Sequence, residues 1–208
     1  GAILIYISIY NVNSVTDRPI FFSLFHSVSA FCNGGFSTLS NSLYEESVRF
    51  NYFFHTIIAW LIITGGLGYS VMINHYLQLK NFVLAKLSNI NVLGFSYKKE
   101  LTRTSTNSRI ILITTGLLLL SGTLLFFISE YNGSLKEHDM VGKIMVSFFN
   151  STTPRTAGFN NVNMAELGIP AIMLIMALMW IGASPGSTGG GIKTTTFAVA
   201  LLNLWNQI

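Results

Sequence analysis

Residues 143–160 read KIMVSFFNSTTPRTAGFN, and residues 20–37, which lie 123 positions earlier, read IFFSLFHSVSAFCNGGFS. In this register Gly35-Phe36 falls on Gly158-Phe159. Each stretch begins as an apolar segment and ends in a small, polar turn that contains glycine. An apolar helix of this length is too short to cross a bilayer, so it predicts a re-entrant segment that enters the membrane and turns back. The pair is an internal repeat, which decides the architecture.

Three long stretches around these segments carry no charged residue. They comprise residues 50–79, 110–129 and 167–192, with 30, 20 and 26 residues. Because a helix needs about 20 apolar residues to cross a bilayer, each stretch is long enough to do so. A soluble helix bundle is disfavoured, since the segment IILITTGLLLLSGTLLFFI at 110–128 lacks the polar stripe of a surface helix.

The composition agrees with an all-α integral membrane protein. Of the 208 residues 50% are hydrophobic and only 10% are charged, against about 25% charged in soluble domains. The hydrophobic content also excludes disorder. A single cysteine, Cys32, excludes a disulfide framework and a multi-cysteine metal site. Because the sequence begins with Gly1 and ends in the apolar run LLNLWNQI, we expect a piece of a longer protein, with no signal peptide to interpret.

Basic residues cluster between the first and second of the charge-free stretches. Residues 80–109 contain six of them and one acid, whereas the loops 11–49 and 130–166 together contain more acids than bases. The positive-inside rule therefore predicts that 80–109 is cytoplasmic and that both loops lie outside. A nucleic-acid site would need stacking aromatics among the basic residues, and only Tyr97 is near. The six are Lys80, Lys86, Lys98, Lys99, Arg103 and Arg109.

Charges and lengths together predict a unit that occurs twice: an outward span, a re-entrant helix, a glycine turn and an inward span. The first unit covers residues 1–79 and the second covers 110–208, and the basic linker 80–109 joins them. The predicted segments of the first unit are 1–10, 20–37 and 50–79, and those of the second are 110–129, 143–160 and 167–205.

The glycine turns predict a path for cations. Non-helical backbone at membrane depth is tolerated where it is buried in protein or lines a water-filled cavity. Glycine lets such a backbone point its carbonyls at an axis, where they replace the hydration shell of an ion. A re-entrant helix that points its C-terminal end at the same cavity adds a partly negative dipole.

The last apolar stretch contains SPGSTGGGIKTTT at 184–196. Proline and glycine disfavour a continuous helix there, so we expect half-helices at about 167–182 and 194–205 with a loop that serves as a gate or binding site. Lys193 would contact acceptors on this loop or extend to the cytoplasm. The stretch resembles a phosphate-binding loop, but Ile192 separates the last glycine from Lys193 and no strand precedes it.

No other motif indicates chemistry. The four histidines show no metal-ligand spacing and no carboxylate pair accompanies them, so we expect packed side chains; they are His26, His55, His75 and His138. The run Gly65-Gly66-Leu67-Gly68 predicts a close helix approach, with a hinge as the alternative. We therefore expect neither an enzyme nor a bound cofactor.

Three motifs in order, FCNGGFSTLSNSL, STTPRTAGFNNVN and SPGSTGGGIKTTTFAVALL, resemble the Trk/Ktr/HKT superfamily of potassium transporters, and the last is most similar to the bacterial Ktr-type membrane subunit. That family is built from four M1–P–M2 repeats around one pore, with potassium-channel-like pseudo-four-fold symmetry. The resemblance implies that this chain holds the second repeat at 1–79, whose first helix is incomplete, and the third at 110–208. The family pattern has alanine at the positions of Gly34 and Gly189.

The resemblance also implies the roles of individual residues. The selectivity filter would bind K⁺ through backbone carbonyls, and a gating loop would obstruct the path below it. The second filter turn would be Asn33, Gly34, Gly35 and Phe36; the third would be Thr156, Ala157, Gly158 and Phe159; the gating loop would include Ser184, Pro185, Gly186, Ser187, Thr188, Gly189, Gly190, Gly191 and Lys193.

The implied setting is a bacterial plasma membrane, crossed several times by a homodimer that associates with a separate cytoplasmic ring of nucleotide-binding subunits. Dependence on Na⁺ stays open. The alternative function is an alternating-access secondary transporter that uses the broken helix as its substrate site, but the two units run in the same direction, which favours a pore. A nucleotide-hydrolysing enzyme would need a carboxylate for Mg²⁺ after a strand, and none is evident.

Overall fold

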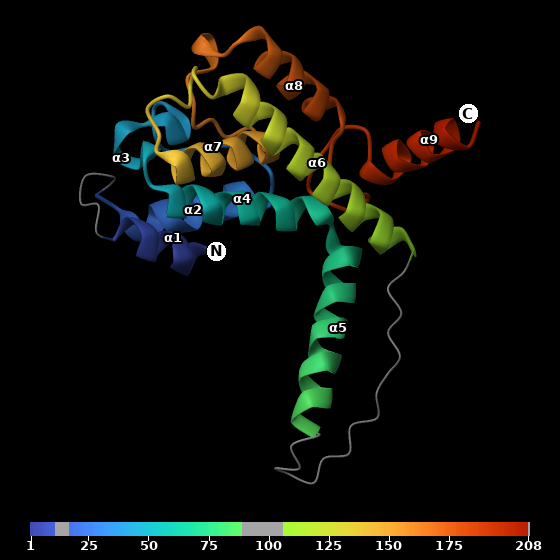
Figure 1. Ribbon diagram of the computed structural model, residues 1–208. Coiled ribbons are helices and arrows are strands. Elements are labelled where there is room, and N and C mark those ends of the chain that lie inside the picture. Colours follow the sequence, from blue (N-terminus) through green and yellow to red (C-terminus); the bar gives the residue numbers. More distant parts are fainter. Residues whose placement is uncertain (11–16, 89–105, 208) are drawn as a thin grey trace.

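The computed structural model of the chain describes residues 1–10, 17–88 and 106–207, without the side chains of 82–88. Throughout the described part, helices are joined by turns, which confirms the predicted all-α class (Figure 1). The helices are α1 (Ala2–Ile9), α2 (Pro19–Phe31), α3 (Glu46–Arg49), α4 (Tyr52–Leu67), α5 (Tyr69–Ser88), α6 (Thr106–Glu130), α7 (Met140–Thr152), α8 (Ile169–Trp180) and α9 (Thr194–Gln207), with short 3₁₀ turns at Ser42–Tyr44 and Met164–Glu166.

The two short apolar segments form helices of equal length, α2 and α7, with 13 residues each. Helix α2 begins at Pro19, whose missing amide hydrogen is no loss at a helix start. Helix α7 begins after Asp139, whose carboxylate accepts the amide of Gly142 at 3.0 Å. The described residues before each turn are therefore helical where the sequence predicts it.

Two apolar cores hold the helices together. The first lies among α1, α2, α4 and α7, and the second lies among α6, α7 and α8, so that α7 contributes to both. In Figure 1, α4 and α7 lie side by side, and α6 runs diagonally between α7 and α8. Residues at the centre of the cores include Phe22, Phe54, Phe149 and Phe159 in the first and Phe126, Leu135, Val146 and Ala171 in the second.

The predicted span at 50–79 is not a single straight helix. Helix α4 ends at Leu67, and α5 leaves at 104° to it, so that it extends away from the rest of the molecule (Figure 1). The bend occurs at Gly68, which has a φ of 81°. A Cβ atom there would lie 2.9 Å from the Pro185 carbonyl oxygen, so both the backbone angle and the close approach require glycine. Of the two predictions for the glycine run, a close helix approach and a hinge, the hinge describes Gly68 better.

Of the three predicted crossings, α6 is the one helix among the described residues that has the length and hydropathy of a span by itself; its best window has a mean hydropathy of 2.3. The bent pair α4 and α5 qualifies only when counted together, and α8 is a shorter apolar helix. Large apolar side chains nevertheless face outward along α6 and α8. They include Ile113, Leu117, Leu120, Leu124 and Ile128 on α6 and Ile169, Met173, Met176 and Trp180 on α8.

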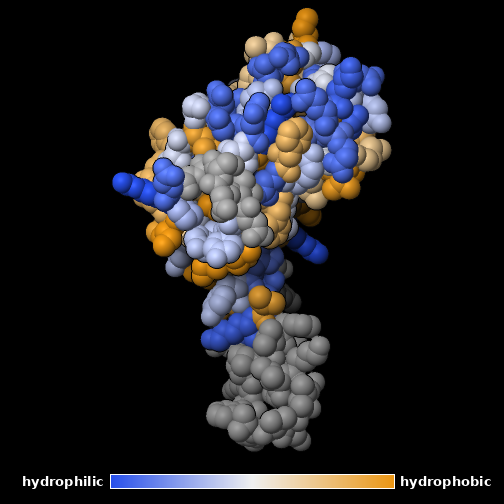
Figure 2. Space-filling model, turned by 90° about the vertical axis from the view of Figure 1, so that its left-hand side faces the viewer, coloured by the Kyte–Doolittle hydropathy of each residue, from blue (hydrophilic) through white to orange (hydrophobic). Residues whose placement is uncertain are grey.

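Both ends of the predicted linker 80–109 are helical. Residues 80–88 continue α5, residues 106–109 begin α6, and 89–105 lie outside the described residues. The opposite end of the molecule is formed by α3 and the connections around it. Hydrophilic residues cover much of that face and hydrophobic ones lie mainly at its rim (Figure 2).

Glu130 is a buried carboxylate at this polar end, where it joins three elements. Its Oε1 atom accepts the amide of Gly168 at 2.8 Å, at the start of α8, and its Oε2 atom accepts the amide of Ser134 at 3.0 Å. The carboxylate thus ties the end of α6 to the start of α8, where a negative charge also suits the helix dipole.

Replacement of Glu130 by Gln is expected to lower the free energy of unfolding by about 1–3 kcal/mol, because the amide group must turn an N–H toward one of these two donors. Thermal unfolding of the detergent-solubilised protein measures this as a lower midpoint. Glu166→Gln is the matched control, since Glu166 is exposed and its bond to Asn163 survives as an amide contact. Equal midpoints for the two variants would show that the Glu130 contacts add no stability.

Candidate functional site

The turns after α2 and α7 have matching backbone conformations. Asn33 and Gly35 adopt positive φ angles of 53° and 68° in the first turn, and Thr156 and Gly158 adopt 74° and 89° in the second. In the 123-residue register, Asn33 corresponds to Thr156 and Gly35 to Gly158. A left-handed backbone is uncommon for asparagine and threonine, and such angles cluster at functional sites. The two turns therefore share an unusual local structure.

The two turns also touch each other. A Cβ atom at Gly35 would lie 2.9 Å from the Cα atom of Gly158 and would overlap the carbonyl oxygen of Ala157. At Gly158 a Cβ atom would lie 3.6 Å from the Cα atom of Gly35, which is an ordinary contact. The structure thus brings together the predicted site residues of both turns, and Gly35 is the position where the contact excludes a side chain.

Helix hydroxyls hold the far end of each turn. The Ser29 hydroxyl donates to the Phe36 carbonyl at 2.8 Å, and the Thr153 hydroxyl donates to the Phe159 carbonyl at 2.6 Å. The carbonyls of residues 33–35 and 156–158, in contrast, accept no hydrogen bond from the described residues. Backbone carbonyls without a donor are available to a cation. Among the described residues, six of the eight predicted filter residues have such carbonyls.

Two buried histidines form hydrogen bonds close to the turns. The search for metal-ligand spacing in the sequence could not predict this role. In α2, His26 Nδ1 lies 2.9 Å from the Phe22 carbonyl and must donate to it, so Nε2 accepts from the Ser37 hydroxyl at 3.0 Å. In α4, His55 Nδ1 lies 3.3 Å from the Asn161 side-chain nitrogen. Both rings therefore contact a residue one or two positions after a turn.

Arg155, which directly precedes the second turn, is also buried. Its Nη2 atom donates to the Gly182 carbonyl at 3.3 Å, and its Nε atom has no partner among the described residues. A charge at this depth is costly and is typical of functional positions in membrane proteins. The sequence analysis did not single out Arg155, although its position within an apolar region was the available signal.

The Gly-rich segment between α8 and α9 folds back on itself as a loop. The amide of Gly182 donates to the Ile192 carbonyl at 3.0 Å, and the amide of Ala183 donates to the Gly190 carbonyl at 3.1 Å. The predicted break between two half-helices is therefore confirmed. Lys193 Nζ donates to the Gly189 carbonyl at 2.8 Å, so it contacts the loop as the first of the two predicted alternatives has it.

This loop is attached to the α4–α5 bend. The Ser184 hydroxyl donates to the carbonyls of Gly66, at 2.9 Å, and Leu67. The amide of Tyr69, the first residue of α5, donates to the Gly186 carbonyl at 3.3 Å. The loop therefore lies in the bend, and the glycines of α4 allow it to approach.

Charged and titratable groups gather at the polar end, around a cavity of about 110 Å³. Arg49 pairs with Glu137 at 2.6 Å, and the Tyr52 hydroxyl lies 2.9 Å from His138 Nδ1. Burial, followed by the positive charge of Arg49, lowers the pKa of His138 below its ordinary value. The neutral ring can then accept the Tyr52 hydroxyl, which ties this loop to the start of α4.

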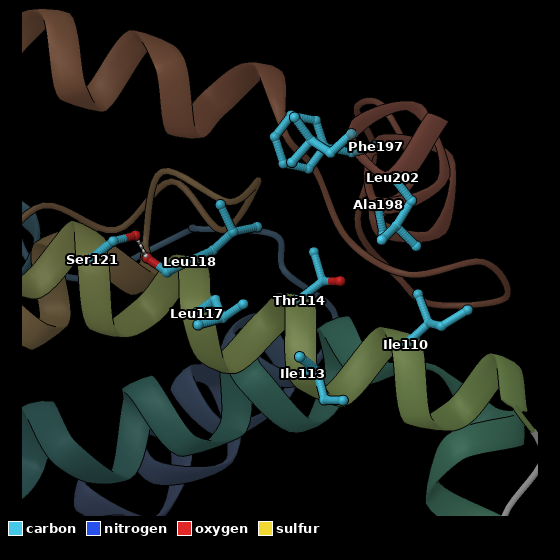
Figure 3. Close-up of a pocket in the computed structure, with 10 residues that line it drawn as sticks. Ile110, Ile113, Thr114, Leu117, Leu118, Ser121, Phe197, Ala198 and Leu202 are labelled. Carbon is cyan, nitrogen blue, oxygen red and sulfur yellow. Dashed lines mark hydrogen bonds between the residues drawn. The ribbon is translucent and has the colours of Figure 1, made fainter. Parts of the chain in front are cut away.

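A larger cavity of about 500 Å³ lies between α6 and α9. In Figure 3, Phe197, Ala198 and Leu202 of α9 face the α6 helix, where Thr114 and Leu118 lie opposite. Its lining is almost entirely apolar, and it lies apart from the two turns. Among the described residues, no group of three or more His, Cys, Asp or Glu side chains is placed to hold a metal ion.

Comparisons with known proteins agree on one family. The sequence profile described as "TrkH: Cation transport protein" matches residues 2–208. The potassium/sodium uptake protein NtpJ of Enterococcus hirae is 36% identical over 188 residues, which cover 90% of this chain and 37% of that protein. The Ktr system potassium uptake protein B of Vibrio alginolyticus is 37% identical over 195 residues, which cover 89% of this chain and 37% of that protein.

A solved structure has the same fold. The crystal structure of the potassium transporter TrkH from Vibrio parahaemolyticus superposes with a TM-score of 0.65 and 19% sequence identity, over 99% of this chain and 38% of that chain. The present chain therefore spans a little over a third of the length of these relatives.

Proposed function

The chain belongs to the TrkH family of cation transport proteins and is a membrane protein, and on this premise we propose that it forms part of a channel-like path for K⁺ uptake. In this proposal it supplies the second and third of four M1–P–M2 repeats, at 1–79 and 110–208. The helices α2 and α7 are the pore helices. The turns at 33–36 and 156–159 are two of the four parts of a selectivity filter.

One observation carries the proposal: two turns from distant parts of the chain touch and leave carbonyls without donors. The free carbonyls belong to residues 33–35 and 156–158. Carbonyl oxygens in such an arrangement replace the water around a K⁺ ion. The helices α2 and α7 end at these turns, so their partly negative C-terminal ends also favour a cation. Each turn contributes one glycine at the left-handed position, and we expect modest discrimination between K⁺ and Na⁺.

The loop between α8 and α9 is the proposed gate. The position of the loop supports this role, because the loop is hydrogen-bonded to the α4–α5 bend and to the first turn. The ammonium of Lys193 donates to the Gly189 carbonyl, which would otherwise be able to bind a passing cation. In this arrangement the loop obstructs the path below the filter.

The proposed setting is a bacterial plasma membrane that the protein crosses several times, with 80–109 in the cytoplasm and the polar end outside. The exposed apolar faces of α6 and α8 would contact lipid or further protein. The relatives include potassium uptake proteins of Ktr systems. From the resemblance to that family we also propose that the protein forms a homodimer and associates with a cytoplasmic nucleotide-binding ring.

Cation flux through the complete transporter in liposomes tests this function. With K⁺, Rb⁺ and Na⁺ gradients in turn, we expect fast flux of K⁺ and Rb⁺ and slower flux of Na⁺. Liposomes without protein give the background. Flux that saturates at a slow turnover, or that carries only an organic solute, would instead favour alternating access with the broken helix as the substrate site.

A further inference from the structure

The Thr188 hydroxyl joins the loop between α8 and α9 to the first turn. It accepts a hydrogen bond from the Asn33 side-chain nitrogen at 3.0 Å and donates to the Phe31 carbonyl, at the end of α2, at 3.2 Å. The amide of Thr188 also donates to the Gly65 carbonyl of α4 at 3.4 Å. One residue of the loop is thus bonded to a turn, to the end of a pore helix and to α4.

Two glycines allow the loop to approach α2 and the two turns closely. A Cβ atom at Gly65 would overlap the Phe31 carbonyl and lie 3.1 Å from the Thr188 hydroxyl. A Cβ atom at Gly189 would lie 2.5 Å from the Thr156 hydroxyl and 3.4 Å from the Asn33 side-chain nitrogen. The residue after Thr188 therefore lies between the two turns, and a side chain there would have to displace the side chains of Thr156 and Ala183.

The two turns are attached to the loop in different ways. Asn33, which the first turn holds at a φ of 53°, donates its side-chain amide to Thr188, and its Oδ1 atom has no partner among the described residues. The corresponding Thr156 hydroxyl touches the loop at Gly189, but it too has no partner among the described residues. The loop is therefore hydrogen-bonded to a residue of the first turn itself, whereas at the second turn it is bonded to Arg155, the residue before the turn, and packed against Thr156.

We infer that Thr188 is a positioning residue that couples the gate to the filter, an inference that rests on the function proposed above. When the loop leaves its place, Asn33 loses the acceptor that fixes its side chain, and the first turn loses a restraint on a left-handed backbone angle, which is uncommon for residues other than glycine. Opening of the path and loss of K⁺ selectivity then occur together. The effect enters through the first turn, because among the described residues no side chain of the second turn itself is bonded to the loop.

The test uses Thr188→Val and Thr188→Ala in the complete transporter, measured for K⁺ and Na⁺ flux in liposomes. Two hydrogen bonds are lost, so we expect K⁺ flux to rise about three- to tenfold, together with a lower K⁺/Na⁺ permeability ratio. Thr188→Ser keeps the hydroxyl and should restore both values. Thr123→Val is the matched control, since the Thr123 hydroxyl bonds only to the Leu119 carbonyl of its own helix, at 2.6 Å.

The possible outcomes separate the inference from the proposed function. Higher flux with an unchanged permeability ratio overturns the coupling, as does unchanged behaviour of both variants while deletion of 186–191 raises flux. Absence of K⁺ flux in every variant, the deletion included, overturns the proposed function itself. Alanine retains little bulk and valine retains the shape of threonine, so agreement between the two variants separates loss of the hydroxyl from a packing defect.

Discussion

Replacement of Gly158 by Ser is expected to lower the K⁺/Na⁺ permeability ratio about tenfold. Gly158 has a φ of 89°, an angle that costs an L-residue about 1–2 kcal/mol. Space does not forbid the substitution, since the nearest atom to a new Cβ would be the Gly35 Cα atom at 3.6 Å. The backbone should therefore relax toward an ordinary angle and turn the carbonyls of 156–158 away from the ion, while the protein still folds.

Bi-ionic permeability in liposomes or under voltage clamp measures this effect. Gly116→Ser is the matched control, because Gly116 lies in α6 and a Cβ atom there would meet open space. That variant should keep the ratio of the unmodified protein. A Gly158→Ser transporter that conducts with an unchanged ratio would remove these carbonyls from the ion path.

Deletion of residues 186–191 is expected to raise K⁺ flux at least about tenfold in the absence of any activating subunit, a factor that corresponds to about 1.4 kcal/mol. The deletion removes Thr188, which is bonded to the first turn, and the Gly189 carbonyl that holds Lys193. Gly182 and Ile192, which flank the deleted segment, already lie close together, because the amide of Gly182 donates to the Ile192 carbonyl at 3.0 Å. The helices α8 and α9 can therefore stay in place.

The same liposome assay measures the deletion beside the unmodified protein at equal reconstituted amounts. Thermal unfolding in detergent establishes that both are folded. Thr188→Gly keeps the loop length but removes the Thr188 hydroxyl bonds, since the other five residues of 186–191 are already glycine or serine, and its flux should lie between the two. A folded deletion variant that conducts no faster would exclude the loop as the obstruction.

Local rules predicted the short helices and the break. Periodic apolar residues and a following turn place α2 and α7 within a few residues of their observed bounds, and Pro185 with its glycines places the gap between α8 and α9. The register between the repeated stretches also paired Gly35 with Gly158, residues that the structure puts in contact. These features depend on nearby residues, or on a symmetry that the sequence itself displays.

Features that depend on distant partners were not predicted. The bend at Gly68 forms against Pro185 and Gly186, more than a hundred residues away, so the glycine run indicated a hinge only as an alternative and not its angle. For the same reason the stretch predicted as one segment at 50–79 consists of two helices at a sharp angle. Arg155 was missed because its acceptor, the Gly182 carbonyl, belongs to a segment that the chain reaches only much later.

The contact between the α4–α5 bend and the loop between α8 and α9 has a thermodynamic consequence. The amide of Tyr69, where α5 begins, is bonded to the Gly186 carbonyl, so the orientation of α5 and the position of the loop are not independent variables. Any ligand that prefers one orientation of α5 must shift the population of the loop. Reciprocity then requires that the loop alter the affinity for that ligand by the same factor, so that an ion in the path and a partner on α5 sense one another without contact.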